Sequence, residues 1–99
     1  MEDGPRLYAV ITGWLPGFLV IEPVQAVWRI REFDLGGAER APRAGPLVIS
    51  RPEAIAEAYS ALGPDLQNFW IIPDDEPDAI AYALGHGQPG VERRLRFEE

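Results

Sequence analysis

Carboxylates form the densest polar cluster of the sequence, in the stretch Asp74-Asp75-Glu76 and at Asp78. Oxygen ligands of this kind suit Mg²⁺ or Ca²⁺. Their spacing differs from that of an EF-hand loop, which needs alternating oxygens, a central glycine and a later glutamate. Acidic residues also stabilise the start of a helix, by capping it and by opposing its dipole. We therefore interpret the cluster as a helix start and keep a metal site as the alternative.

His86 is the only histidine, and imidazole can act as a general acid or base near neutral pH. A catalytic triad would also need a nucleophile, but the sequence has no cysteine and shows no nucleophile elbow around its serines. His86 lies in residues 85–90, which match the G-x-G-x-x-G pattern letter for letter. That pattern binds pyrophosphate between a strand and a helix, whereas here it follows a helix. We predict a plain loop, with no catalytic residue, cofactor or metal ion.

The three tryptophans are candidates for binding to another protein, because tryptophan often anchors protein interfaces. Trp28 and Trp70 lie within predicted strands, so we expect both in the core. Trp14 stands at the end of the first strand, beside a turn where a large side chain is hard to bury. Trp14 and Phe18 are therefore the candidates for an exposed contact with a partner.

An internal repeat defines the elements that must position these residues. The segment Ser-Arg-Pro-Glu-Ala-Ile-Ala at 50–56 recurs as Asp-Glu-Pro-Asp-Ala-Ile-Ala at 75–81, and each copy follows a short apolar run. Each copy predicts a strand that leads into a capped helix. Ser50 is the expected cap of a helix over 51–62.

Asp75 is the expected cap of a second helix, which ends at Gly85 after less than three turns. Runs of β-forming residues predict a hairpin with a type II turn at Pro16-Gly17. Residues 34–45 read as a long, flexible surface loop. The predicted strands cover residues 7–12, 18–21, 27–33, 47–49, 69–72 and 91–97.

This order of elements predicts a fold of the α+β or mixed α/β class. We expect a single mixed sheet of five or six strands, with an N-terminal antiparallel hairpin and two strand-helix units. The strand-helix-strand crossovers predict parallel pairing, and we place both helices on one face of the sheet. The chain of 99 residues should form a single globular domain over 1–99, with residues 1–5 frayed.

Composition narrows the classes of function. Without cysteine there is no disulfide framework and no thiolate metal site. No apolar run reaches the length of a membrane span, and the acidic start does not resemble a signal peptide, so we expect a soluble, cytoplasmic protein. The net charge is −7, and residues 50–85 hold seven acidic residues against one arginine. Such a field repels nucleic acid and favours a basic partner.

Three functions remain as hypotheses. We favour a non-enzymatic interaction module, such as an inhibitor, antitoxin, immunity protein or phage-encoded antagonist, that docks on a protein with a basic surface. The alternative is a small metal-dependent or acid-base hydrolase that uses residues 74–78 and His86. A third hypothesis is a subunit of a homo-oligomer, built through a sheet edge or the Trp14 region. The predicted partner-binding residues of the favoured hypothesis are Trp14, Phe18, Glu53, Glu57, Asp74, Asp75, Glu76 and Asp78.

Overall fold

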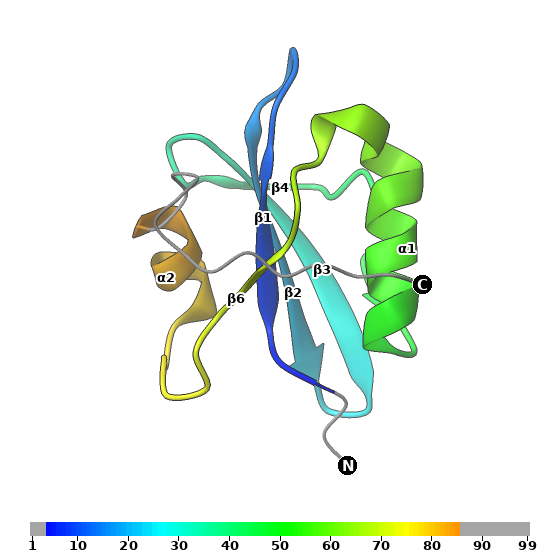
Figure 1. The fold of residues 1–99 in the computed structure, drawn as a ribbon, viewed down its shortest axis with the longest axis vertical. Helices are drawn as coiled ribbons and strands as arrows, with labels where there is room; N and C mark the ends of the chain where they lie inside the picture. The colour runs from blue at the N-terminus through cyan, green and yellow to red at the C-terminus, as the bar shows by residue number, and fades with distance from the viewer. Residues whose placement is uncertain (1–3, 86–99) are drawn as a thin grey trace.

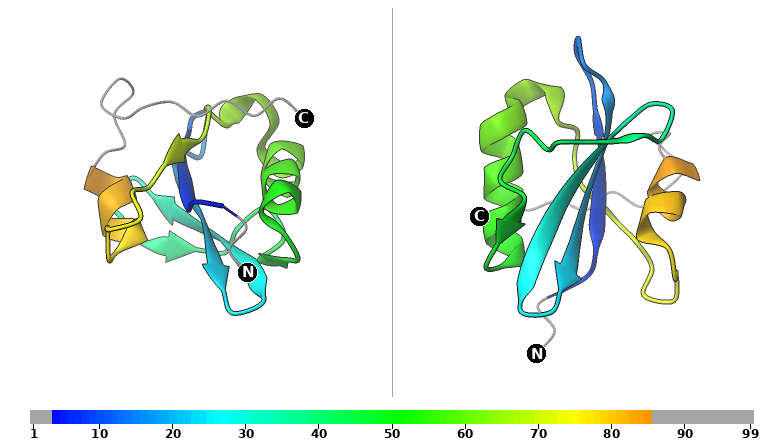
Figure 2. Two further views of the ribbon diagram at one scale, coloured as in Figure 1. Left: turned by 60° about the horizontal axis from the view of Figure 1, so that its bottom comes forward. Right: turned by 180° about the vertical axis from the view of Figure 1, so that it is seen from behind.

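The computed structural model describes residues 4–85, which form one sheet with a helix on either side (Figures 1 and 2). The predicted fold class, α+β with one sheet of five or six strands and two helices, is confirmed. The strands are β1 (Leu7–Ile11), β2 (Gly17–Val24), β3 (Val27–Asp34), β4 (Glu39–Arg40), β5 (Leu47–Val48) and β6 (Trp70–Ile71). The helices are α1 (Arg51–Leu62) and α2 (Ala79–Gly85), and a 3₁₀ turn spans Gly63–Asp65.

The strand order is β4-β3-β2-β1-β6, and β5 pairs with the same edge of β3 as β4 does. All pairs within the described residues are antiparallel, so the predicted parallel pairing is wrong. The reason is that α1 connects strands at opposite edges of the sheet. β5 and β6 do run in the same direction, as a crossover requires, but β3, β2 and β1 lie between them.

Both faces of the sheet are buried, each under one helix. Leu7 and Ala9 of β1 pack in the core beneath α1, whereas Tyr8 between them packs in the core beneath α2. The prediction that the helices share one face is therefore wrong, as Figure 2 shows. The cause lies in β1 and β2, whose continuous apolar runs place apolar side chains on both faces, so that each face needs a cover.

Helix α1 begins and ends as its sequence predicts. The Ser50 hydroxyl accepts a hydrogen bond from the Glu53 amide at 3.3 Å, and Gly63 follows the last turn with a φ of 56°. Ile55, Ala58 and Leu62 of this helix are buried. Tyr59 is half-exposed, and its ring meets Phe69 edge-on. Local capping signals are enough to define this helix.

Helix α2 begins at Ala79, and Asp78 caps it in place of the predicted Asp75. The Asp78 carboxylate accepts hydrogen bonds from the Ile80 and Ala81 amides at 3.1 and 3.2 Å. The Glu76 carbonyl accepts a hydrogen bond from Arg6, and the Ile80 amide that it would bond in a helix donates to Asp78 instead, so this helix begins later than the first copy of the repeat predicts.

The first hairpin is confirmed, but its turn differs from the prediction. Gly17 pairs with Ile11 inside β2, and the residue with positive φ is Gly13. Residues 34–45 are also more ordered than a flexible loop, because they contain β4 and two anchored arginines. The predicted strand at 91–97 and the start of the chain at 1–3 lie outside the described residues.

Candidate functional site

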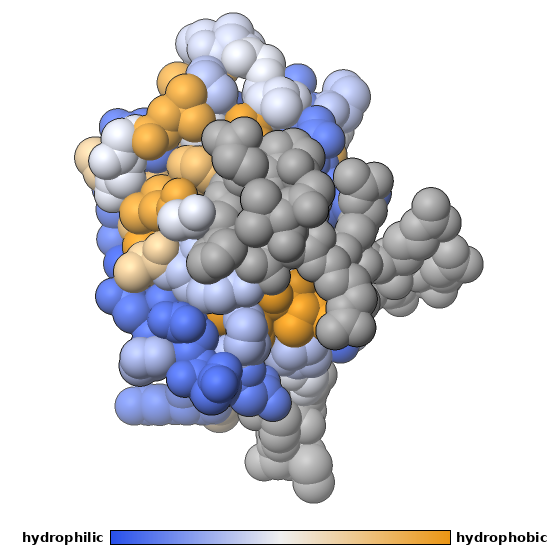
Figure 3. Space-filling view, turned by 60° about the vertical axis from the view of Figure 1, so that its left-hand side comes forward, coloured by the Kyte–Doolittle hydropathy of each residue, from blue (hydrophilic) through white to orange (hydrophobic). Residues whose placement is uncertain are grey.

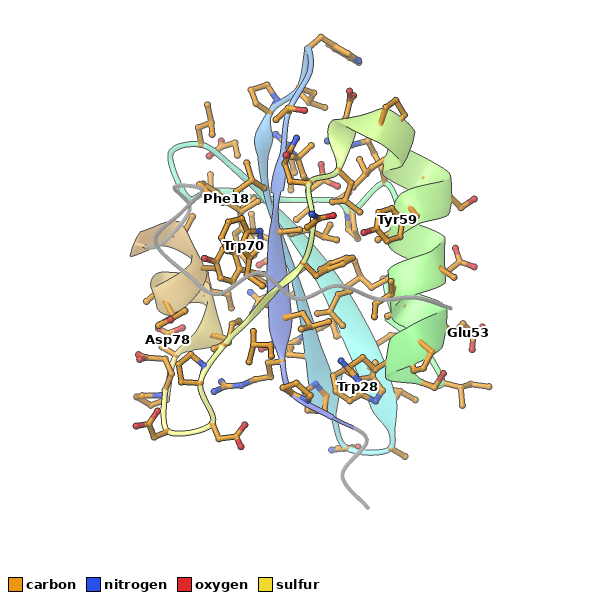
Figure 4. All side chains as sticks on the ribbon, viewed as in Figure 1. Phe18, Trp28, Glu53, Tyr59, Trp70 and Asp78 are labelled. Carbon is orange, nitrogen blue, oxygen red and sulfur yellow. The ribbon has the colours of Figure 1, made fainter. Side chains whose placement is uncertain are left out.

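The connection between β1 and β2 projects beyond the rest of the molecule, at the top of Figure 1. It carries Trp14, whose side chain is 85% exposed, as the sequence predicts for this position. Trp28 and Trp70 are buried in the core, also as predicted. Phe18 is only 9% exposed and lies on the α2 side of the sheet with Trp70, so it does not join Trp14 in an exposed pair (Figure 4).

The loop that carries Trp14 is held at its first residue. The Thr12 amide and hydroxyl both donate to the Asp65 carbonyl, at 2.7 and 3.1 Å. Gly13 follows with a φ of 95°, a backbone conformation that residues with a side chain rarely adopt, and the Asp65 carboxylate lies beside it. The 3₁₀ turn after α1 therefore fixes one end of the loop.

The other end of the loop is held by two arginines from the segment after β3. Arg40 and Arg43 each donate through Nη2 to the Leu15 carbonyl, at 3.0 and 3.1 Å. Both side chains also pair with the carboxylate of Glu32, at 2.8 and 2.7 Å. The Arg43 amide donates to the second oxygen of Glu32 at 2.9 Å. We call Glu32, Arg40 and Arg43 the arginine clamp.

Glu32 is the only charged side chain that is fully buried among residues 4–85. Burial raises the pKa of its carboxyl, but hydrogen bonds from Arg43 and Arg40 outweigh that effect and bring the pKa below its ordinary value of 4.5. Glu32 is thus ionised at neutral pH. One sequence signal pointed to it: the alternation of β3 places Glu32 on the same face as Trp28 and Ile30, where a carboxylate needs a partner.

A second ionic network lies on the other face of β2 and β3. Glu22 pairs with Arg29 directly opposite it at 2.7 Å, and Arg31 pairs with Glu39 at 2.6 Å. Hydrogen bonding to Glu39 raises the pKa of Arg31, and hydrogen bonding to Arg31 lowers the pKa of Glu39. These cross-strand pairs stabilise the sheet surface beside α2.

The predicted acidic residues form two separate groups. Glu53 and Glu57 are exposed on α1, whereas residues 74–78 precede α2 on the other side of the sheet (Figure 4). Glu53 and Asp78 both lie in the lower half of the view in Figure 4, whereas the loop between β1 and β2 is at its top. The hydrophilic surface in Figure 3 likewise covers the lower part of the α2 side. The eight predicted contact residues therefore do not make one continuous face.

The turn at 73–76 is built around Arg6. Its guanidinium donates to the carbonyls of Pro73 and Glu76, at 2.9 and 2.6 Å. Asp74 and Asp75 are exposed and Glu76 is partly buried. Around this turn and throughout residues 4–85, no three His, Cys, Asp or Glu side chains lie close enough to hold a metal ion. His86 and most of the 85–90 loop lie outside the described residues.

Neither helix of the described part of the chain is long and apolar enough to cross a membrane. Comparison with known proteins adds no further guide to function. No family model, curated protein or solved structure matches this chain.

Proposed function

We propose that the protein is a non-enzymatic interaction module that docks on a partner protein through Trp14. The observation that supports this is a tryptophan held 85% exposed on a loop that is braced at both ends. Burying such a side chain releases about 2 kcal/mol or more, and tryptophan is enriched among the residues that dominate binding energy. A loop that is already ordered loses little conformational entropy on binding.

The charge of the chain favours a basic partner. At −7, the net charge attracts positive surfaces over a distance of about one Debye length, roughly 8 Å at physiological salt. Because the acidic groups lie away from the Trp14 loop, we assign them to steering the encounter and assign the contact itself to Trp14. The module would then serve as an inhibitor, antitoxin, immunity protein or phage-encoded antagonist of a basic target.

Photo-crosslinking in the native host identifies the partner. We expect a specific crosslinked product when benzoylphenylalanine replaces Trp14, and none when it replaces Ser60, which is exposed on α1. The affinity of the purified pair then tests the proposal. Trp14→Ala should weaken binding about 30-fold, the effect of a hot-spot residue. Leu47→Ala, at another exposed apolar side chain, is the matched control.

Unchanged affinity in Trp14→Ala would contradict the proposal. Light scattering separates a foreign partner from self-association, because a dimer that dissociates in Trp14→Ala would make the protein a homo-oligomer subunit instead. Binding that weakens about equally in Leu47→Ala would show a diffuse contact and would also count against Trp14 as the anchor.

A further inference from the structure

We propose that Glu32 is a positioning residue, which holds Trp14 in its projecting place through Arg40 and Arg43. The value of that place for binding rests on the proposed function. The link itself rests on geometry, because the arginine clamp joins a carboxylate of the core to the carbonyl of the residue after Trp14.

Glu32 is a fully buried carboxylate. Removing a carboxylate from water costs several kcal/mol unless charged partners and hydrogen bonds replace the water. Here the two guanidiniums and the Arg43 amide supply four hydrogen bonds to its two oxygens. Each guanidinium is therefore bonded to a carboxylate that is itself fully buried.

The two arginines connect Glu32 to the loop that carries Trp14. Arg40 and Arg43 are partly exposed, so water could satisfy the donors that Glu32 leaves over. Both side chains instead direct an Nη2 donor to the same oxygen, the Leu15 carbonyl. Gly17 makes this approach possible for Arg40, because a Cβ there would lie only 2.9 Å from Arg40 Nη2.

The two anchors of the loop lie close together along the chain. Thr12 is bonded to Asp65, and Leu15 is bonded to the arginine clamp. Only Gly13 and Trp14 lie between these fixed points. With both anchors in place, the backbone of Trp14 is restrained on either side. Without the clamp, the next fixed point after Thr12 is Gly17 in β2, and residues 13–16 lie between them.

Backbone ¹⁵N relaxation of the isolated protein tests the link without a partner. In the wild type we expect order parameters of about 0.85 for Trp14 and Leu15, the value of a rigid backbone. In Glu32→Gln these should fall below about 0.6, while those of β1 and β2 outside the loop stay unchanged. Glu22→Gln is the matched control, since Glu22 is also a mostly buried carboxylate paired with two arginines.

Arg43→Lys keeps the proposal testable if Glu32→Gln does not fold. Lysine retains the charge beside Glu32 but lacks the forked donors that reach both Glu32 and Leu15. Unchanged order at Trp14 in a folded Glu32→Gln or in Arg43→Lys would overturn the proposal. An equal loss of order in Glu22→Gln would also overturn it, because the effect would then be general.

Binding measurements separate this inference from the proposed function. If Trp14→Ala weakens binding but Glu32→Gln leaves the loop rigid, the function stands and the positioning role fails. If Glu32→Gln loosens the loop but Trp14→Ala binds like the wild type, the positioning role stands and the function fails. When both hold, Glu32→Gln should weaken binding about 10-fold through faster dissociation.

Discussion

Gly17 lies where the backbones of β2 and β3 approach closely. It pairs with Ile11 on one side and Asp34 on the other, and its Cα faces the Phe33 carbonyl. A Cβ at this position would lie well inside van der Waals contact with that backbone oxygen, which cannot move without disturbing β3. Glycine is required here by close approach, since its φ is not in the left-handed region.

We expect Gly17→Ala to lower the free energy of unfolding by at least about 2 kcal/mol, as overpacking against a rigid neighbour does. Urea denaturation with an unchanged m-value measures the loss. Gly36→Ala is the control, because a Cβ there would make only an ordinary contact with Asp34 at 3.5 Å. Its effect should stay within about 0.5 kcal/mol. Equal stability of the two variants would contradict this account of Gly17.

At the scale of elements, the start of α2 offers a test between two caps. Asp78 accepts hydrogen bonds from the Ile80 and Ala81 amides, whereas Asp75 is exposed in the turn before it. Asp78→Ala should therefore lower the free energy of unfolding by about 1 kcal/mol, and Asp75→Ala by less than about 0.5 kcal/mol. Thermal or urea unfolding of the two variants measures the difference. A larger effect in Asp75→Ala would favour a helix start three residues earlier.

Local signals account for the elements that the sequence predicts well. Ser50, Pro52 and Gly63 act within a few residues of the ends of α1, so they define it without knowledge of the rest of the fold. Strand pairing joins residues far apart in sequence, and the repeat alone could not show that β5 and β6 lie at opposite edges. The second copy of the repeat misleads for a similar reason, since Arg6, which is far away in sequence, holds the carbonyls of Pro73 and Glu76 in a turn where the first copy begins its helix.

In the candidate site, too, local features can be predicted from the sequence and long-range contacts cannot. The exposure of Trp14 follows from the turn residues next to it in the sequence. The arginine clamp escapes sequence analysis, because Arg40 and Arg43 meet Glu32 only once the segment after β3 has folded back along the sheet edge. The net charge is a sum over the whole chain, so it could not show that the predicted acidic residues fall into two separate groups.

The whole molecule should lose stability in acid, and Glu32 should account for part of the loss. Its pKa in the folded state lies below 4.5, because the hydrogen bonds from Arg43 and Arg40 outweigh the effect of burial. The unfolded chain therefore binds a proton at a higher pH than the folded protein does. The stabilisation from the ionised carboxylate is complete above the unfolded pKa, and it is lost as the pH falls through the folded pKa.

Urea denaturation between pH 7 and pH 2 measures this contribution. Glu32→Gln should be less stable than the wild type at pH 7 by about 1.5–3 kcal/mol, the value of a hydrogen bond to a charged group. The difference should shrink below the unfolded pKa, because protonation also removes the charge from wild-type Glu32. Glu57→Gln, at an exposed carboxylate on α1, should follow the wild type throughout. If the difference in free energy of unfolding between the wild type and Glu32→Gln stays constant down to pH 2, Glu32 stabilises the protein through its packing and not through its charge.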